Sequence, residues 1–302
     1  MTGFWVGVVG ALRIVQANCN KLTSGYLRSP VLFLKYGAFF ECMAAVFSVL
    51  YACLTGFYGF GAATMVCAFL SAVCYVTELA TSLEALKTTP LVLCNMCAMG
   101  GGIVLASIVS IVLFDEPMTL LQWVGVAAFF AAVWCLSPVQ GTGTKRMTAK
   151  SWLLLVVNFL INGAASVLSK YFAVRVENGN AALYSCFTYA ISSMLFLGLL
   201  ALYTIRKAQK KEKEPAGPAT LPRPLYLYGI LLGATCASIV YLVTTLSRSV
   251  TVVVLNTVPS VISIVGCLLL GAIFFREKIT VRNLCGVVCG ALSVLLIVSP
   301  GV

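Results

Sequence analysis

Three charged side chains interrupt stretches of sequence that are otherwise apolar: Arg13, Glu41 and Glu78. At ~1.5 Å of helical rise per residue, each lies roughly 10–15 Å below the same face of a membrane. Because an unpaired charge in hydrocarbon is costly, we expect Arg13 to contact Glu41, Glu78 or both. Such a cluster can bind a charged solute, and with no histidine in the chain any proton coupling must use Glu41 and Glu78. The alternative is a fixed salt bridge that only sets helix packing.

Two further segments, 3–21 and 151–173, each place polar residues on one helical face. In the first segment, the spacing i, i+3, i+7 relates Arg13, Gln16 and Asn20. In the second segment, the spacing i, i+4, i+8, i+11 relates Asn158, Asn162, Ser166 and Ser169. Two tyrosines would add aromatic walls with polar tips. The predicted substrate-binding set is Arg13, Gln16, Asn20, Glu41, Tyr75, Glu78, Asn95, Asn162, Ser166, Tyr241 and Asn256. The alternatives are hydrogen bonds between helices and, for the tyrosines, a position at the membrane interface.

The elements that carry these residues are long apolar runs. The chain of 302 residues is 61% hydrophobic and 10% charged, whereas soluble domains contain about 25% charged residues. Ten runs approach the ~20 residues that a membrane span needs, and they cover 3–21, 31–54, 61–84, 89–113, 119–137, 151–173, 180–205, 225–246, 250–274 and 281–299. Because no cleavage pattern follows the first run, we expect a retained helix rather than a signal peptide. The predicted fold class is an all-α membrane protein with ten transmembrane helices.

The chain also repeats itself. Residues 114–119 (Phe-Asp-Glu-Pro-Met-Thr) recur as residues 275–280 (Phe-Arg-Glu-Lys-Ile-Thr), and Gly125 and Gly286 follow each glutamate after nine residues. Similar offsets align further pairs: Asn95 with Asn256, Lys87 with Arg248, Lys21 with Lys170, Arg13 with Asn162, and Asn20 with Ser169. Since each copy holds five helices, the second copy enters the membrane in the opposite sense, as in inverted-repeat transporters. We therefore predict two five-helix repeats, 1–140 and 141–302, that form one integrated transport domain.

These motifs resemble those of the drug/metabolite transporter superfamily, specifically its ten-helix branch built from two EamA-type repeats. The resemblance rests on the Phe-x-Glu-x-x-Thr motif with its spaced glycine in both halves, and on Lys21 and Lys170 near the ends of the first helices. It implies a transporter, in a family whose members export drugs, amino acids or other metabolites, or exchange nucleotide sugars and sugar phosphates. The four-helix relatives carry a proton-binding glutamate in the first helix. Here that helix has Arg13 and no acid, so this role is not carried over.

The leading functional prediction is a secondary transporter that exports small organic solutes by alternating access. The alternative is an exchanger of nucleotide sugars or phosphorylated metabolites. Export of cationic or neutral solutes would use Glu41 and Glu78. Exchange of anions would use basic residues, namely Arg13, Lys35, Lys87 and Arg248.

Other classes of protein fit the sequence less well. We predict no enzyme, because the chain has no histidine and no acidic pair at metal-ligand spacing. We predict no cofactor and no metal, because Cys94-x-x-Cys97 has no second ligand pair; the thirteen cysteines are expected to pack between helices. The net charge of +11 lies in connectors, where it orients a membrane protein rather than binding nucleic acid. A channel or a non-transporting scaffold is a further alternative.

The distribution of lysine and arginine predicts the orientation of the protein in the membrane. The odd-numbered connectors hold fourteen lysines and arginines and the even-numbered connectors hold two. The positive-inside rule then places both termini outside, whereas the family resemblance implies cytoplasmic termini. The chain has no Asn-x-Ser/Thr sequon, and we expect a multi-pass protein of the bacterial inner membrane. Residues 206–224 are expected to form a flexible loop, and the partners are a small-molecule substrate and the lipid bilayer. A homodimer is compatible with the sequence.

Overall fold

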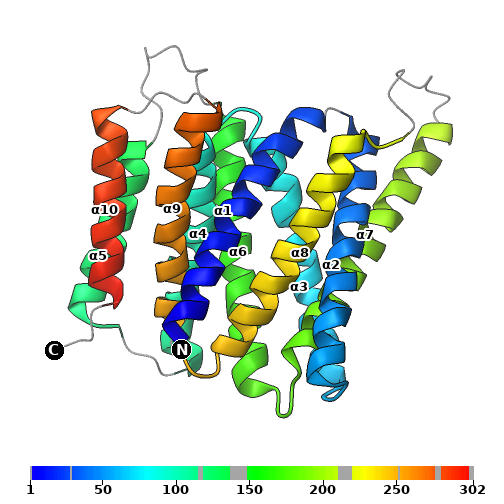
Figure 1. Cartoon of the computed structure of the whole chain (residues 1–302), viewed down its shortest axis with the longest axis horizontal. Coiled ribbons are helices and arrows are strands. Elements are labelled where there is room, and N and C mark those ends of the chain that lie inside the picture. Colours follow the sequence, from blue (N-terminus) through cyan, green and yellow to red (C-terminus); the bar gives the residue numbers. More distant parts are fainter. Residues whose placement is uncertain are drawn as a thin grey trace.

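The computed structural model describes residues 2–27, 29–114, 118–136, 148–209, 220–250, 252–275 and 280–298. Within these ranges the regular secondary structure consists of ten helices. They are α1 (Thr2–Tyr26), α2 (Pro30–Thr55), α3 (Ala62–Ala85), α4 (Leu91–Phe114), α5 (Leu120–Leu136), α6 (Ala149–Arg175), α7 (Ala181–Gln209), α8 (Arg223–Leu246), α9 (Val252–Phe275) and α10 (Val281–Val298). Successive helices run in opposite directions, so α1 begins and α10 ends at the same end of the molecule (Figure 1). We call this end the near end, and the end that holds the α3–α4 turn the far end.

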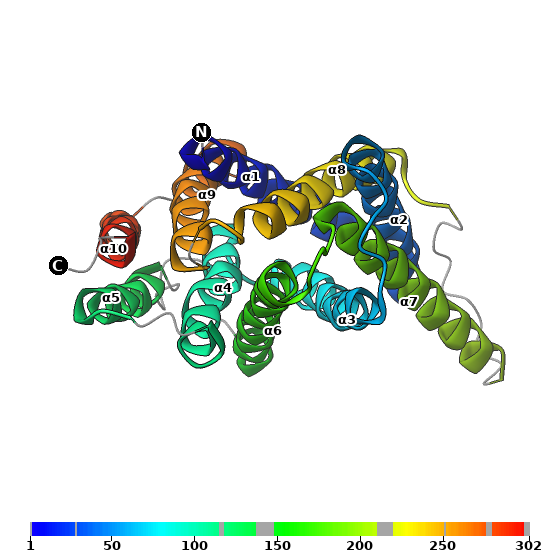
Figure 2. The same cartoon turned by 90° about the horizontal axis from the view of Figure 1, so that it is seen from below.

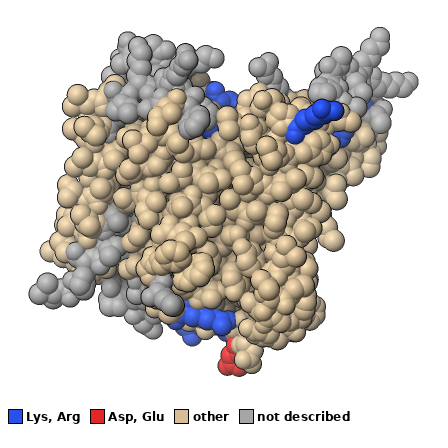
Figure 3. All heavy atoms as spheres, viewed as in Figure 1, with Lys and Arg blue, Asp and Glu red and all other residues tan. Residues whose placement is uncertain are grey.

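The helix lengths and surface suit a lipid bilayer. Six helices, α2, α3, α4, α6, α7 and α8, are long and apolar enough to cross a membrane. Large apolar side chains such as Leu54, Phe60 and Leu120 are exposed. Figure 3 shows a broad middle band without coloured charges on the face that it draws, with lysine and arginine toward both ends. The protein is therefore a multi-pass integral membrane protein, and the crossing of all ten helices stays a prediction.

Eight of the described helices form a closed ring. The contacts run α9–α1–α8–α2 along a first layer and α4–α6–α3–α7 along a second layer. The layers join at their edges, where α2 packs on α7 and α4 packs on α9. Figure 2 shows the two layers from below, with α5 and α10 side by side beyond α4 and α9.

Glycine permits the closest helix contact in the second layer. A Cβ atom on Gly101 of α4 would overlap the backbone carbonyl of Phe159 in α6, and a Cβ on Gly163 would lie 2.7 Å from Gly101 O. The α4 and α6 backbones therefore touch, as small residues allow in membrane helices. This contact holds α6 against α4 and fixes the face that α6 turns toward the ring interior.

Several sequence motifs fall outside the described residues. These are Asp115, Glu116 and Pro117, residues 276–279, residues 210–219 of the predicted 206–224 loop, and the last residue of two predicted spans (137 and 299). The repeat motif that supports the family resemblance is thus only partly described.

Candidate functional site

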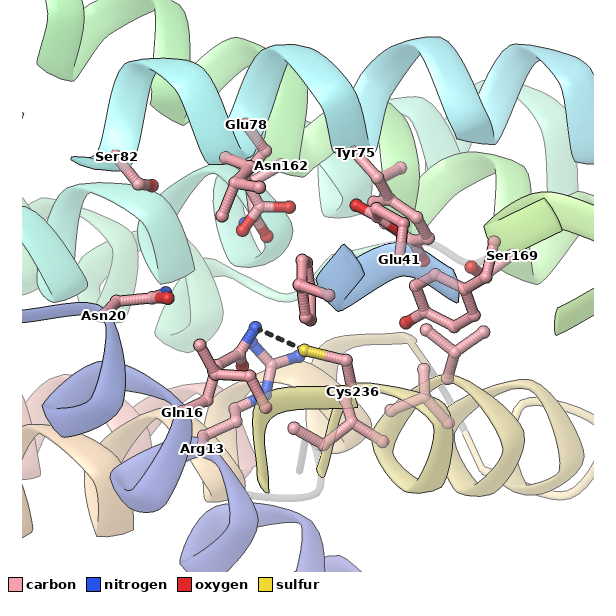
Figure 4. A pocket seen from close by; sticks show the side chains of 18 of the residues that line it. Arg13, Gln16, Asn20, Glu41, Tyr75, Glu78, Ser82, Asn162, Ser169 and Cys236 are labelled. Atoms are coloured by element: carbon pink, nitrogen blue, oxygen red, sulfur yellow. Dashed lines mark hydrogen bonds between the residues drawn. The ribbon is translucent and has the colours of Figure 1, made fainter. Parts of the chain in front are cut away.

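A cavity of about 100 Å³ lies between the two layers of the ring (Figure 4). Six helices contribute to its wall: α1, α2 and α8 from the first layer, and α3, α6 and α7 from the second. The wall holds Arg13, Gln16, Asn20, Phe40, Glu41, Tyr75, Glu78, Leu79, Ser82, Asn162, Ala165, Ser166, Ser169, Tyr189, Leu232, Cys236, Ile239, Val240 and Val243. The cavity is therefore bounded by both charged and apolar side chains.

The α1 face of the cavity is rich in poorly satisfied polar groups. Arg13 Nε and Asn20 Oδ1 are buried and have no hydrogen-bond partner in the part of the chain that the structure describes. Gln16 Nε2 donates to Cys236 Sγ at 3.3 Å, the contact drawn dashed in Figure 4. A thiol is a weak acceptor, so the protein itself satisfies little of this face.

The facing wall carries the two acids. Glu78 Oε1 accepts a hydrogen bond from Asn162 Nδ2 at 2.8 Å. Glu41 is only 1% exposed, and no described residue donates a hydrogen bond to its Oε2. The rings of Tyr75 and Tyr189 stack beside them, with centroids 5.6 Å apart. This wall therefore offers acceptor oxygens next to an aromatic surface.

The expected contact between Arg13 and the acids is not formed. Within the described residues, no ion pair of 4.0 Å or less joins Arg13 to Glu41 or Glu78. Figure 4 shows Arg13 on one wall and Glu78 and Glu41 on the opposite side of the cavity. The arrangement of the ring explains this, because α3 with Glu78 belongs to the other layer, and α8 lies between α1 and α2, the helix that carries Glu41.

A smaller cavity of about 40 Å³ continues from the main one. It shares Arg13, Gln16, Asn20, Glu78, Ser82 and Asn162 with the main cavity, and it extends to Leu86 and to α4. Asn95 lies on this branch, and its Nδ2 donates to Ser263 Oγ of α9 at 3.0 Å. Asn95 is thus placed beside the main cavity rather than in it.

The remaining predicted residues divide into two groups. Ser166 lines the main cavity together with the other polar residues predicted from α1, α2, α3 and α6. Tyr241 does not line it and stacks on Tyr51 instead, with ring centroids 4.7 Å apart. Asn256 is buried near Gly102 and lines neither cavity. Asn158, on the same predicted stripe as Ser166, donates to Ser82 Oγ at 2.7 Å and links α6 to α3.

Sequence reasoning did not single out Phe40, Tyr189 or Cys236 in the cavity wall. Tyr189 and Cys236 carry no charge and belong to no polar stripe. The internal repeat nevertheless contained a signal, because the offset that aligns Lys21 with Lys170 also aligns Phe40 with Tyr189. The offset that aligns Lys87 with Arg248 also aligns Tyr75 of α3 with Cys236 of α8. All four residues line the same cavity.

The described residues provide no cluster for a metal ion. No group of three or more histidine, cysteine, aspartate or glutamate side chains lies close together in the part of the chain that the structure describes. Cys94 and Cys97 are both buried.

Comparisons with known proteins place the chain in a family. A sequence model of the EamA-like transporter family matches residues 149–299, which is half of the chain. The chain therefore belongs to the EamA-like transporter family, within the drug/metabolite transporter superfamily, and its members are transporters.

The fold also has relatives among solved structures. One, described only as "Crystal structure of protein", has a TM-score of 0.64 and 14% sequence identity, over 97% of this chain and 96% of that chain. At this identity the similarity concerns the fold alone. A search of curated proteins finds no match.

Proposed function

We propose that this protein is a secondary transporter that exports small organic solutes by alternating access, with the main cavity as its binding site. One observation carries the proposal: Arg13 and Glu41 line a cavity in a transporter-family chain, and each has a buried polar atom without a hydrogen-bond partner among the described residues. A polar group buried without a hydrogen bond is costly, and buried polar atoms in folded proteins are nearly always paired. A solute that supplies the missing partners would remove this cost.

The chemistry of the wall favours a small solute with a cationic or hydrogen-bond-donating group. Glu41 and Glu78 present acceptor oxygens, and the Tyr75–Tyr189 pair offers an aromatic surface for a cation or an apolar group. Arg13 can bind an acceptor on the same solute. The cavity of about 100 Å³ is well below the roughly 300–1,000 Å³ of sites for drug-sized ligands.

The alternative, exchange of nucleotide sugars or phosphorylated metabolites, receives less support. Lys87 pairs with Glu84 at 2.6 Å, and Arg248 donates to the Gly179 carbonyl. Neither lines the described cavities. Arg13 would thus face a phosphate alone, with two carboxylates nearby that would repel it.

Alternating access requires two similar halves that can exchange shapes, and the helix contacts support this. The two halves can be compared by exchanging α1 with α6, α2 with α7, and so on up to α5 with α10. This exchange turns the α4–α6 contact into α9–α1, the α3–α6 contact into α8–α1, and the α2–α8 contact into α7–α3. All six contacts are present, and α2–α7, α4–α9 and α5–α10 convert into themselves. We propose ten membrane spans in two inverted repeats on this basis.

Glu41 and Glu78 are also our candidates for proton coupling. A carboxylate that alternates between a proton and a cationic solute would exchange one for the other across the membrane. The unpartnered Oε2 of Glu41 is suited to this role.

We further propose that the protein resides in the inner membrane of a bacterial cell, which the lack of an Asn-x-Ser/Thr sequon supports.

The test begins with a thermal-shift screen of the purified protein against amino acids, cationic dyes and nucleotide sugars. A ligand raises the melting temperature by mass action, and the best one is then labelled for counterflow in proteoliposomes. Glu41→Gln and Glu78→Gln should each lower counterflow by roughly tenfold or more, because each removes a charged acceptor.

Glu84→Gln is the matched control, since Glu84 is 38% exposed and pairs with Lys87 and Lys150 at the far end of α3. Its counterflow should stay near that of the wild type. If both buried-acid variants also transported like the wild type, the assigned site would be wrong.

A further inference from the structure

Lys21 and Lys170 occupy equivalent places in the two halves of the chain. Each lies five residues before the last residue of its helix, α1 and α6 respectively. Lys21 Nζ donates to the carbonyl oxygens of Leu86 and Thr89, at 3.2 Å each. Lys170, only 6% exposed, donates from Nζ to the carbonyl oxygen of Ser247 at 3.1 Å.

The acceptors are equivalent as well. Leu86 is the C-cap of α3 and Ser247 is the C-cap of α8. The offset of 161 that aligns Lys87 with Arg248 aligns these two caps, and four backbone hydrogen bonds follow each helix end at matching positions. The last carbonyls of a helix lack donors within the helix and carry partial negative charge, so a lysine ammonium is a favourable partner.

Each lysine links one layer of the ring to the other. Lys21 belongs to α1 in the first layer, and it bonds the α3–α4 turn of the second layer at the far end (Figures 1 and 2). Lys170 belongs to α6 in the second layer, and it bonds the α8–α9 turn of the first layer at the near end. The two links therefore join the same two layers at opposite ends of the cavity.

Both links also adjoin the cavity. The smaller cavity reaches Leu86, the acceptor of Lys21. The residues that precede the two lysines, Asn20 and Ser169, both line the main cavity. A change at the cavity wall can therefore act directly on either link.

We propose that Lys21 and Lys170 are the two latches of the transport cycle: Lys21 holds the far end closed and Lys170 holds the near end closed. This inference rests on the proposed alternating-access function. When the layers separate at one end, the lysine there releases its helix terminus while the equivalent lysine keeps the other end closed.

Among the described residues, the two ends are not equally secured. At the near end, Arg248 also donates to the Gly179 carbonyl and Asn180 Nδ2 donates to Gly56 O at 2.7 Å, and both contacts join the two layers. At the far end, Glu84 pairs with Lys87 and with Lys150, and these ion pairs stay within the second layer. The far end should therefore open more readily when its latch is removed.

The test is hydrogen–deuterium exchange of the full-length protein in lipid nanodiscs without solute. In Lys21→Met, amides of the α1 end and the α3–α4 turn should exchange roughly tenfold faster, since a hydrogen bond to a charged group is lost. The near-end amides of the α8–α9 turn should exchange at the wild-type rate or more slowly. Lys170→Met should give the reverse pattern with a smaller change, because Arg248 and Asn180 still join the layers there.

Two further variants control for a general loss of stability. Lys150→Met removes a lysine from the same far end but breaks a contact within one layer, and it should leave both ends unchanged. Lys21→Arg keeps the cation and its donors, and it should restore slow exchange at the far end. If Lys21→Met does not yield folded protein, Lys21→Gln should give the same direction of change, because it removes the charge and keeps an amide donor.

Equal loosening of both ends by either lysine variant, or no change in both, would overturn the latch proposal. The measurement needs no solute, so its outcome is separate from that of counterflow. Counterflow without end-specific exchange would refute the latches alone, and end-specific exchange without transport of any screened solute would refute the transport function alone.

Discussion

The two halves of the chain build the cavity wall from aligned positions but with unequal chemistry. The first half contributes Arg13, Glu41 and Glu78, and the positions aligned with them in the second half are Asn162, Ala190 and Ile239. Asn162 and Ile239 also line the cavity. Positions that the sequence offsets align therefore line one cavity, and its charged side chains come from the first half of the chain.

The helix contacts show a second kind of divergence. In the second layer, Gly101 of α4 meets Phe159 of α6; the aligned contact in the first layer joins Ile262 of α9 and Gly10 of α1. In the second layer the glycine of this crossing lies on α4, whereas in the first layer it lies on α1 rather than on α9. Close packing needs one small residue at each crossing, and either helix can supply it.

The largest expected effect is a loss of solute affinity, and it tests the difference in charge between the two halves of the cavity wall. Arg13→Asn gives the first half the residue type that the second half has at the aligned position. Loss of the cation should weaken solute binding by roughly a hundredfold, the upper range for hydrogen bonds to a charged group. The affinity is measured by titration calorimetry with the ligand found in the thermal-shift screen. An unchanged affinity would show that the guanidinium of Arg13 does not contact the solute.

The packing difference gives a stability prediction. A Cβ on Gly101 would overlap a backbone carbonyl, whereas a Cβ on Gly10 would lie 2.8 Å from Ile262 Cβ, a side-chain atom that can shift. Gly101→Ala should therefore destabilise the protein by about 2 kcal/mol, and Gly10→Ala by less. Denaturant unfolding in detergent measures both, with Gly198→Ala as control because no atom lies near its Cβ position. Equal losses for Gly101 and Gly10 would contradict the comparison.

A smaller effect is expected when one methylene is removed at each of two aligned positions. Glu78→Asp moves the carboxylate away from Asn162 and should lower counterflow roughly tenfold, about the value of one charged hydrogen bond. Ile239→Val removes the same volume from an apolar wall and should lower counterflow by less, roughly fivefold, since this deletion typically costs about 1 kcal/mol. The reverse order would mean that the apolar half, rather than the acidic half, recognises the solute.

The smallest effect concerns charges outside the cavity. Glu84→Gln breaks the exposed ion pairs with Lys87 and Lys150, and surface ion pairs contribute at most about 1 kcal/mol. Its melting temperature should stay close to that of the wild type. A loss as large as that of Gly101→Ala would show that the far-end ion pairs stabilise the fold as strongly as the helix crossing does.

Much of the architecture could be predicted from the sequence. Apolar runs predict membrane helices because uncharged segments of this length are stable in hydrocarbon, and the ten described helices lie close to the predicted ranges. Helical spacing predicted that Arg13, Gln16 and Asn20 share a face, and they lie together in the cavity wall. The family prediction was confirmed by the match over residues 149–299. The inverted repeat, the substrate and the direction of transport stay predictions.

The sequence by itself determined which segments are helical and which face of α1 and of α6 is polar, because helix formation and periodicity are local properties. Only the tertiary structure decided which faces meet. Membrane helices are apolar on most sides, so hydrophobicity does not select their neighbours. That choice excluded Tyr241 and Asn256 from the cavity and brought Tyr189 and Cys236 into it. It also left Arg13 apart from the acids, because α3 with Glu78 belongs to the other layer and α8 lies between α1 and α2, the helix of Glu41.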